Sequence, residues 1–91
     1  MQKALDARTA NLTLYHLQAC PFCVKVRRQI RRQGLNIRMK EIAEDRAAWD
    51  ELMAGGKLDQ APCLRIDEGG KSTWMYESSD INAYLEKTFG A

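Results

Sequence analysis

Two sets of side chains alternate along residues 12–16, which is the spacing of a β-strand with one set on each face. One set is Leu12, Leu14 and His16, and the other is Thr13 and Tyr15. We predict a strand here that ends near Leu17. Residues 1–10 show no clear period, and we expect them to form a flexible N-terminal arm.

The next segment has the period of a helix. Phe22, Val26 and Ile30 recur every four residues, Lys and Arg fill many of the other positions, and Gly34 supplies a stop. This pattern predicts an amphipathic helix of about three turns. Residues 35–40 alternate again, so a second strand follows the helix, and a strand-helix-strand order implies that the two strands pair in parallel.

The second half of the chain predicts another helix and a β-hairpin. Asp45 can cap a helix that ends at Gly55 and the glycine after it. A third strand begins after Pro62, the turn at residues 67–70 reverses the chain, and residues 72–76 form the return strand.

A last helix starts near Ser78 or Ser79 and carries apolar residues on one side. The predicted order is therefore β-α-β-α-β-β-α, within a domain that we place at residues 11–91.

The composition is that of one globular domain. The chain has 91 residues, of which 45% are hydrophobic and 29% charged. It contains no apolar run near the ~18 residues of a membrane span, and its first residues lack the apolar core of a signal peptide. We therefore expect a cytoplasmic protein with no membrane contact.

Charge is divided unevenly between the two halves. Residues 1–40 contain nine Lys and Arg and one acid, whereas residues 41–91 contain five and eleven. Solvated faces are the usual explanation, and the alternative is a basic surface that attracts anionic partners. No basic strand face carries interleaved aromatic residues, so we expect no nucleic-acid partner.

Two cysteines three positions apart open the basic helix. Only a thiolate attacks a disulfide, so a reactive cysteine must lie where negative charge is stabilised. Cys20 is at the helix cap, where the unpaired N–H groups of Phe22 and Cys23 can point at its sulfur and where Lys25 and Arg27 are near. We predict that Cys20 is the nucleophile.

Cys23 lies one turn further on, on the same face, and is suited to resolve a mixed disulfide. We expect its pKa to be higher than that of Cys20. A zinc knuckle is one alternative, but the chain offers only the isolated Cys63 and His16 as further ligands of this kind, and zinc needs four. Inert core cysteines are the other alternative. We expect no metal site.

Three segments in order resemble those of glutaredoxins: Cys20-Pro21-Phe22-Cys23, Ala61-Pro62, and residues 76–81. The similarity runs from about residue 12 to residue 85. It implies an α/β, thioredoxin-like (glutaredoxin) fold with a four-stranded mixed sheet flanked by three helices. It also implies that Pro62 is cis and faces Cys20; from the residues alone, a trans proline at the start of a strand is the alternative.

The resemblance further implies a glutathione site. Its residues would be Phe22, Ala61, Pro62, Glu77, Ser78, Ser79 and Asp80. The Ala61 backbone would pair with the cysteinyl part of glutathione, and Glu77-Ser78 also resembles the segment of glutathione transferase N-terminal domains that holds the γ-glutamyl group. A helix start with free N–H groups suits an anionic ligand, although an ordinary helix cap is the alternative reading.

Two positions depart from the glutaredoxin pattern. Leu17 stands where many members have a Lys that contacts a glutathione carboxylate, so binding is weaker unless Lys25 or Arg27 substitutes. The usual Gly-Gly before the last helix is also missing. Cys63 is interpreted as a small buried residue, with a regulatory thiol as the alternative, and His16 as structural rather than catalytic.

The resemblance implies a dithiol glutaredoxin that reduces protein or small-molecule disulfides and glutathione mixed disulfides. Glutathione would be a co-substrate, no cofactor would be bound permanently, and the expected partners are glutathionylated or disulfide-containing proteins met by a monomer. Two rival hypotheses are a non-catalytic glutathione-binding module related to transferase N-terminal domains and an iron–sulfur cluster carrier that uses Cys20 from two chains.

Overall fold

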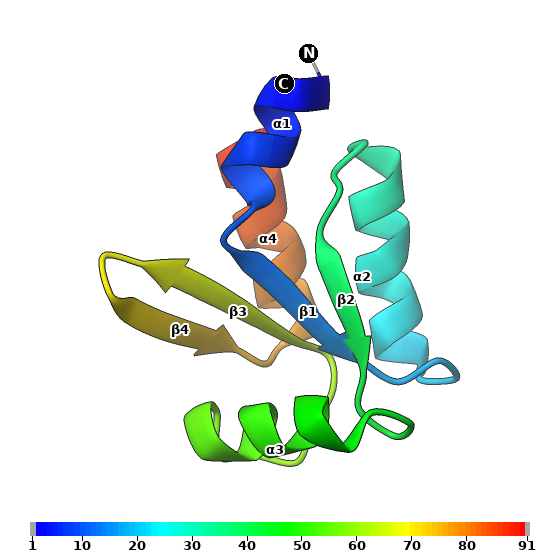
Figure 1. Ribbon diagram of the computed structural model, residues 1–91. Coiled ribbons are helices and arrows are strands. Elements are labelled where there is room, and N and C mark those ends of the chain that lie inside the picture. Colours follow the sequence, from blue (N-terminus) through cyan, green and yellow to red (C-terminus); the bar gives the residue numbers. More distant parts are fainter. Residues whose placement is uncertain (1, 91) are drawn as a thin grey trace.

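A computed structural model describes residues 2–90, with side chains from Asp6 onward. Figure 1 shows an open sheet with helices on both faces. The elements in chain order are α1 (Gln2–Thr9), β1 (Leu12–His16), α2 (Pro21–Arg32), β2 (Arg38–Glu41), α3 (Arg46–Gly55), β3 (Cys63–Glu68), β4 (Lys71–Met75) and α4 (Ser78–Phe89). None of the helices within residues 2–90 has the length and apolarity that a membrane span requires.

The four strands form one mixed sheet in the order β2-β1-β3-β4. β1 pairs in parallel with β2, as the strand-helix-strand order predicts, and antiparallel with β3, which pairs antiparallel with β4. Tyr15 of β1 lies opposite Lys40 on one side and Cys63 on the other. The predicted thioredoxin-like α/β fold with a four-stranded mixed sheet is confirmed.

Both faces of the sheet carry a core, and therefore all five residues of β1 are buried. The core under α2 and α4 includes Leu12, Leu14, Val26, Ile30, Leu64, Ile66, Ile81 and Leu85. The core under α3 is smaller and consists of Tyr15, Ile42, Ala48, Leu52 and Cys63. Asp45 caps α3 as predicted, because its carboxylate accepts a hydrogen bond from the Ala48 backbone N–H at 3.2 Å.

The N-terminal segment differs from its prediction, because residues 2–9 form helix α1 rather than an arm without regular structure. The contacts of its last turn are mainly polar and long-range. The Thr9 hydroxyl donates to the Asn36 carbonyl at 3.1 Å, and the Arg8 guanidinium donates to the Thr88 carbonyl at 2.7 Å while lying over the Phe89 ring. Contacts of this kind leave no apolar period in the sequence. The described chain thus has four helices, one more than the resemblance implies.

The second strand also differs from its prediction, because β2 begins at Arg38 rather than at residue 35. Leu35 and Ile37 are buried, but they enter the core from the loop that precedes the strand. β2 itself is an edge strand with Arg38 and Met39 exposed. The apolar residues at positions 35 and 37 therefore belong to a buried loop and not to the predicted strand.

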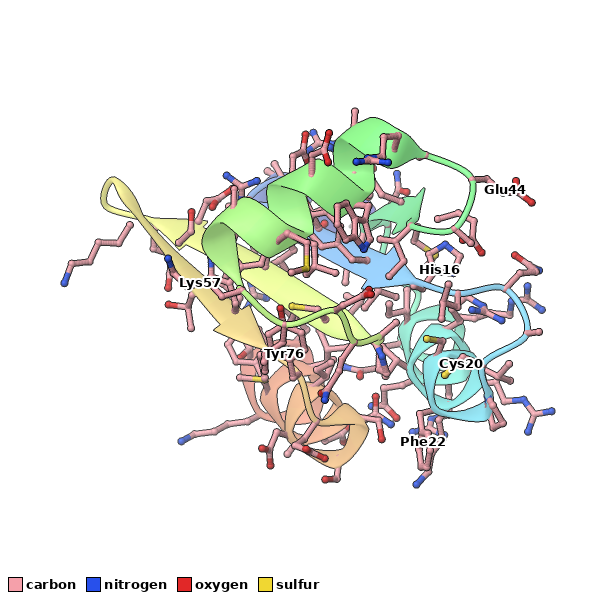
Figure 2. The ribbon with its side chains drawn as sticks, turned by 90° about the horizontal axis from the view of Figure 1, so that it is seen from below. His16, Cys20, Phe22, Glu44, Lys57 and Tyr76 are labelled. Carbon is pink, nitrogen blue, oxygen red and sulfur yellow. The ribbon has the colours of Figure 1, made fainter. Side chains whose placement is uncertain are left out.

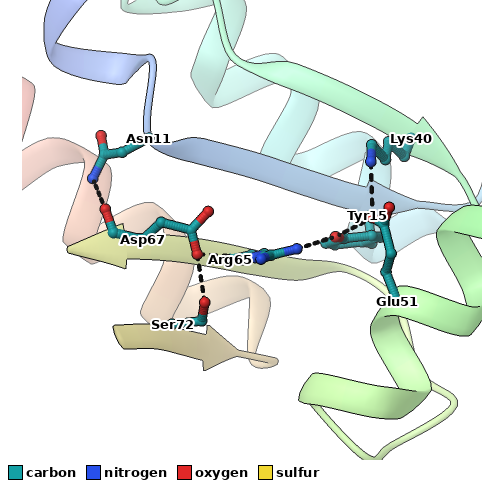
Figure 3. Close-up of polar contacts among 7 residues, drawn as sticks. All are labelled: Asn11, Tyr15, Lys40, Glu51, Arg65, Asp67 and Ser72. Atoms are coloured by element: carbon teal, nitrogen blue, oxygen red, sulfur yellow. Dashed lines mark hydrogen bonds and ion pairs between the residues drawn. The ribbon is translucent and has the colours of Figure 1, made fainter. Parts of the chain in front are cut away.

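A chain of polar side chains crosses the sheet on the face that α3 partly covers (Figure 3). It runs from β2 to β4 through Lys40, Glu51, Tyr15, Arg65, Asp67 and Ser72. At its centre the Tyr15 hydroxyl donates to Glu51 at 2.8 Å and accepts from Arg65 at 3.3 Å. Because Glu51 belongs to α3, this chain ties α3 to all four strands.

Candidate active site

Cys20 lies in the loop between β1 and α2 and is the N-cap residue of α2. Its backbone is extended, with φ −74° and ψ 122°, and Pro21 opens the helix, as predicted. Figure 2 shows Cys20 at the end of α2, with Phe22 beside it and His16 on the β1 side. The Cys20 sulfur lies 3.9 Å from the Ala61 carbonyl oxygen, so residues 41 positions apart meet at this thiol.

The surroundings of Cys20 favour its thiolate. Partial burial is the largest single effect and raises its pKa, but the opposing effects together outweigh it: the nearby Cys23 backbone N–H, Cys23 thiol and Phe22 backbone N–H, together with the Arg27 charge, lower the pKa of Cys20 overall. These N–H groups are the free donors of the first helical turn. The local geometry therefore agrees with the role predicted for Cys20.

Cys23 is fully buried and behaves in the opposite way. Burial raises the pKa of Cys23 to about 11, although the Leu17 backbone N–H donates to its sulfur at 3.4 Å. Both thiols are free in this structure. Cys20 is thus the ionisable thiol of the pair and Cys23 is a protonated thiol beneath it.

Arg27 holds the loop that leads into Cys20. Its guanidinium donates to the Leu17 carbonyl at 3.2 Å, to the Gln18 carbonyl at 2.9 Å and to His16 Nδ1 at 3.0 Å. Burial and the Arg27 charge lower the pKa of His16, so this imidazole is neutral at pH 7. Because Arg27 can only donate, Nδ1 accepts and the His16 proton is on Nε2. These contacts agree with a structural role for His16, which stays a prediction.

Glu41, which belongs to no sequence motif, fixes the same loop from the other side. Its carboxylate accepts from the backbone N–H groups of Gln18 and Ala43, each at 2.6 Å. These hydrogen bonds, of which the one from Ala43 has the larger effect, lower the pKa of Glu41 and keep its carboxylate ionised. Glu41 and Arg27 together hold residues 17–18 in one conformation.

A pocket of about 180 Å³ lies beside this turn. It is lined by five of the seven residues predicted to bind glutathione: Phe22, Ala61, Pro62, Glu77 and Ser78. Gln60 and Tyr76 also line it and were not predicted, whereas the predicted Ser79 and Asp80 do not. The Ala61-Pro62 peptide bond is cis, as the resemblance implied.

The start of α4 leaves its binding groups available. Glu77 is the N-cap residue, and its side chain makes no capping hydrogen bond. The Glu77 side chain therefore does not cap α4, and the capping alternative for Ser78, Ser79 and Asp80 stays open. Ser78, the first residue of α4, faces the pocket together with Glu77.

Tyr76 closes the far wall of the pocket. Its hydroxyl donates to the Leu58 carbonyl at 2.9 Å and accepts from the Leu58 N–H at 3.2 Å. The bonds tie the end of β4 to the loop that carries Gln60 and Ala61.

Cys63, which follows Pro62, is fully buried, and burial raises its pKa to about 12. Within residues 2–90, no group of three His, Cys, Asp or Glu residues could hold a metal ion.

The comparison with protein families gives one match. The model of the glutathione S-transferase N-terminal domain matches residues 14–91, a range that includes both cysteines and the whole pocket. No protein of curated function matches the sequence significantly.

Solved structures confirm the fold. Maleylacetoacetate isomerase from Anaeromyxobacter dehalogenans 2CP-1, a structure with glutathione in its active site, is 23% identical with a TM-score of 0.66, over 87% of this chain and 38% of that one. Glutathione transferase Omega 1C from Trametes versicolor is 12% identical with a TM-score of 0.72, over 87% and 37%. A thioredoxin-like protein is 20% identical with a TM-score of 0.67, over 84% and 95%.

The chain thus spans less than two fifths of the length of the isomerase and the transferase, and nearly all of the thioredoxin-like protein. At these identities the likeness concerns the arrangement of helices and strands. The chemistry of the site has to be argued from its own residues.

The opposite pKa shifts predict the order in which the thiols react. When the reduced, folded protein is alkylated with iodoacetamide near pH 7, Cys20 should be modified first because it alone carries appreciable thiolate. Peptide mass spectrometry over a time course measures the order, with the urea-unfolded protein as the control in which all three cysteines react. Earlier labelling of Cys23 would reverse the assignment.

Arg27 should set the reactivity of Cys20 more strongly than its neighbours on α2 do. Arg27→Gln removes a cation that stabilises the thiolate, so the pKa of Cys20 should rise and its alkylation profile should shift to higher pH. Arg28→Gln is the matched control, because it removes the same charge from an exposed position on the same helix. Equal shifts in the two variants would show that only the net charge of α2 matters.

Proposed function

The chain belongs to the family of glutathione S-transferase N-terminal domains, and we propose that it binds glutathione and carries out thiol–disulfide exchange at Cys20. The observation that carries this proposal is the position of Cys20, whose pKa is lowered and whose sulfur lies 3.9 Å from the Ala61 carbonyl, near the pocket that Ala61 lines. A thiol placed in this way meets the sulfur of a ligand whose backbone pairs with residue 61.

Glutathione fits the pocket in one direction. Its γ-glutamyl end carries both an ammonium and a carboxylate, and Glu77 and Ser78 offer an acceptor and a donor on the pocket wall. Its cysteinyl part would lie along Ala61, next to the Cys20 sulfur. The exposed Phe22 ring would cover the ligand from the α2 side.

The exchange reaction needs only these groups. The Cys20 thiolate attacks the glutathionyl sulfur of a mixed disulfide, a Cys20–glutathione disulfide forms, and the substrate leaves as a thiolate that takes a proton from water. A second glutathione thiolate then attacks the glutathionyl sulfur on Cys20. Glutathione disulfide is released and Cys20 returns as a thiolate. In sum, the mixed disulfide and one glutathione thiol give the substrate thiol and glutathione disulfide: one glutathione thiol is oxidised, and the other half of the disulfide comes from the mixed disulfide.

Cys23 would extend the reaction to protein disulfides. After Cys20 has formed a mixed disulfide with a protein, Cys23 attacks Cys20, releases the protein thiol and closes an intramolecular disulfide, which two glutathione molecules reopen. The negative charge of Cys20 is one of the effects that raise the pKa of Cys23, and it disappears once Cys20 is in a disulfide. Cys23 therefore becomes a better nucleophile at the step that requires it.

The specific class proposed is thus a dithiol, glutaredoxin-like oxidoreductase within the transferase-domain family. Its partners would be glutathione and proteins that carry disulfides or glutathione adducts, met by a monomer in a reducing compartment such as the cytoplasm. The second candidate is a glutathione-binding module without turnover, which the family match favours.

Turnover separates the two candidates. With a glutathionylated small thiol and excess glutathione, the wild-type protein should form glutathione disulfide, and Cys20→Ser should abolish the reaction because no thiolate remains at the helix tip. Cys23→Ser should keep this activity and lose the reduction of protein disulfides. A wild-type protein that binds glutathione in calorimetry yet shows no turnover would establish the binding module instead.

Ser78 should matter for glutathione binding and Ser79 should not, because only Ser78 lines the pocket. Ser78→Ala removes a donor to the γ-glutamyl carboxylate and should raise the dissociation constant for glutathione about tenfold, as expected for a hydrogen bond to a charged group. Ser79→Ala is the matched control at the next position. Isothermal titration of both variants in the Cys20→Ser background measures the two dissociation constants. Equal losses of affinity would place the ligand along the start of α4 rather than in the pocket.

A further inference from the structure

A second pocket, of about 280 Å³, adjoins the first at Ala61. Gln60 and Ala61 line both pockets, so they form the ridge between them. A ligand whose middle part pairs with Ala61 and whose γ-glutamyl end lies near Ser78 must therefore extend its other end into the second pocket. In glutathione that end is the glycyl carboxylate.

The second pocket is poorly suited to a carboxylate. Its walls are largely apolar, from Leu17, Ile42, Ala43 and Trp49, and its one charged residue is Asp59. The Asp59 carboxylate accepts a hydrogen bond from Trp49 Nε1 at 2.9 Å, and it forms no ion pair within residues 2–90. A second carboxylate brought here would meet a like charge without a compensating cation.

Among the described residues, no Lys or Arg lines the second pocket. Leu17 lines the pocket at the position where many glutaredoxins have Lys, and the Arg27 guanidinium donates to the loop carbonyls of Leu17 and Gln18. Arg46 does not line the second pocket; it forms an exposed pair with Asp50 at 3.1 Å and lies over the Trp49 ring, 5.0 Å from its centroid. Lys57 is not part of the lining; Figure 2 shows it at the opposite end of α3 from Glu44.

We propose that this site selects a γ-glutamylcysteinyl thiol whose other end carries no negative charge. The class consists of glutathione derivatives in which the glycyl carboxylate is converted to an amide or joined to an amine. The apolar walls accept the neutral group, and Asp59 favours an N–H donor or a cation there over a carboxylate. This inference rests on the proposed function, since it assumes that the γ-glutamyl end binds near Ser78.

Two ligands that differ by one charge test the inference. The Cys20→Ser protein, which cannot exchange disulfides, is titrated calorimetrically with reduced glutathione and with its C-terminal amide. At low ionic strength the amide should bind about three- to tenfold more tightly, as expected for one like-charge pair relieved near a protein surface. The advantage should shrink as salt screens the charges.

Asp59→Asn should remove this preference by strengthening the binding of glutathione while leaving that of the amide nearly unchanged. The asparagine side-chain oxygen can still accept from Trp49, so the wall is kept. Glu68→Gln is the matched control, because it removes the same charge at the exposed end of β3 and should leave the preference intact. Leu17→Lys should shift the preference toward glutathione.

The outcomes distinguish this inference from the proposed function. Equal affinity for the two ligands, or tighter binding of glutathione, overturns the selectivity and leaves the glutathione site standing. A preference that persists in Asp59→Asn also overturns it, because the residue to which it is assigned would not produce it. Failure of both ligands to bind overturns the proposed function together with the inference.

Discussion

The antiparallel pairing of β1 with β3 is the constraint on which the site depends. β1 is a central strand, and its last residues pair with the first residues of β3, with Tyr15 opposite Cys63. Antiparallel strands bring the end of one beside the start of the other. The loop after β1, which leads to Cys20, is therefore held next to the cis Ala61-Pro62 turn before β3. Cores on both faces of β1 leave this pairing no other register.

The two cysteines show how strongly position within one helical turn controls thiol chemistry. Cys20 lies outside the first turn, where unpaired N–H groups and Arg27 stabilise a negative charge, and Cys23 lies inside it, where water is excluded. The same Arg27 keeps the preceding loop in place through two carbonyl groups. Electrostatic stabilisation and loop geometry thus share one side chain, so the reactivity of Cys20 cannot be separated from the conformation that presents it.

Local patterns predicted most of the fold, and long-range contacts account for the rest. The helix at α2, the Asp45 cap and the hairpin follow from residues close in sequence. Helix α1 does not, because Arg8 and Thr88 are eighty positions apart and meet through a polar contact. The sequence predicts that β2 starts at residue 35 rather than at Arg38, because buried residues of a loop and of a strand are equally apolar.

The candidate site divides in the same way. Cys20, Cys23 and the Glu77-Ser78 segment stand out as motifs, and the structure places all of them around one turn or pocket. Tyr76 opens the segment 76–81 but was not predicted to line the pocket. Gln60 and Asp59 belong to no motif, and the fold of the loop after α3 places them at the two pockets. Their contribution could have been predicted from the sequence only if that loop had a regular period, and it has none.

The uneven charge of the two halves acquires a more specific meaning in three dimensions. Two cations of α2, Arg28 and Arg31, line a hollow between α2 and β2 and neither of the pockets beside Ala61. Such charges still raise the local concentration of an anionic ligand, because their field extends over about a Debye length of 8 to 10 Å. Asp59 acts on the same ligand only at contact. Attraction at a distance governs how fast a ligand arrives, whereas the charges that line the pocket govern how long it stays. A basic helix and an acidic pocket wall are therefore compatible: in the proposed function the first would recruit anionic thiols as a class, and the second would discriminate among them.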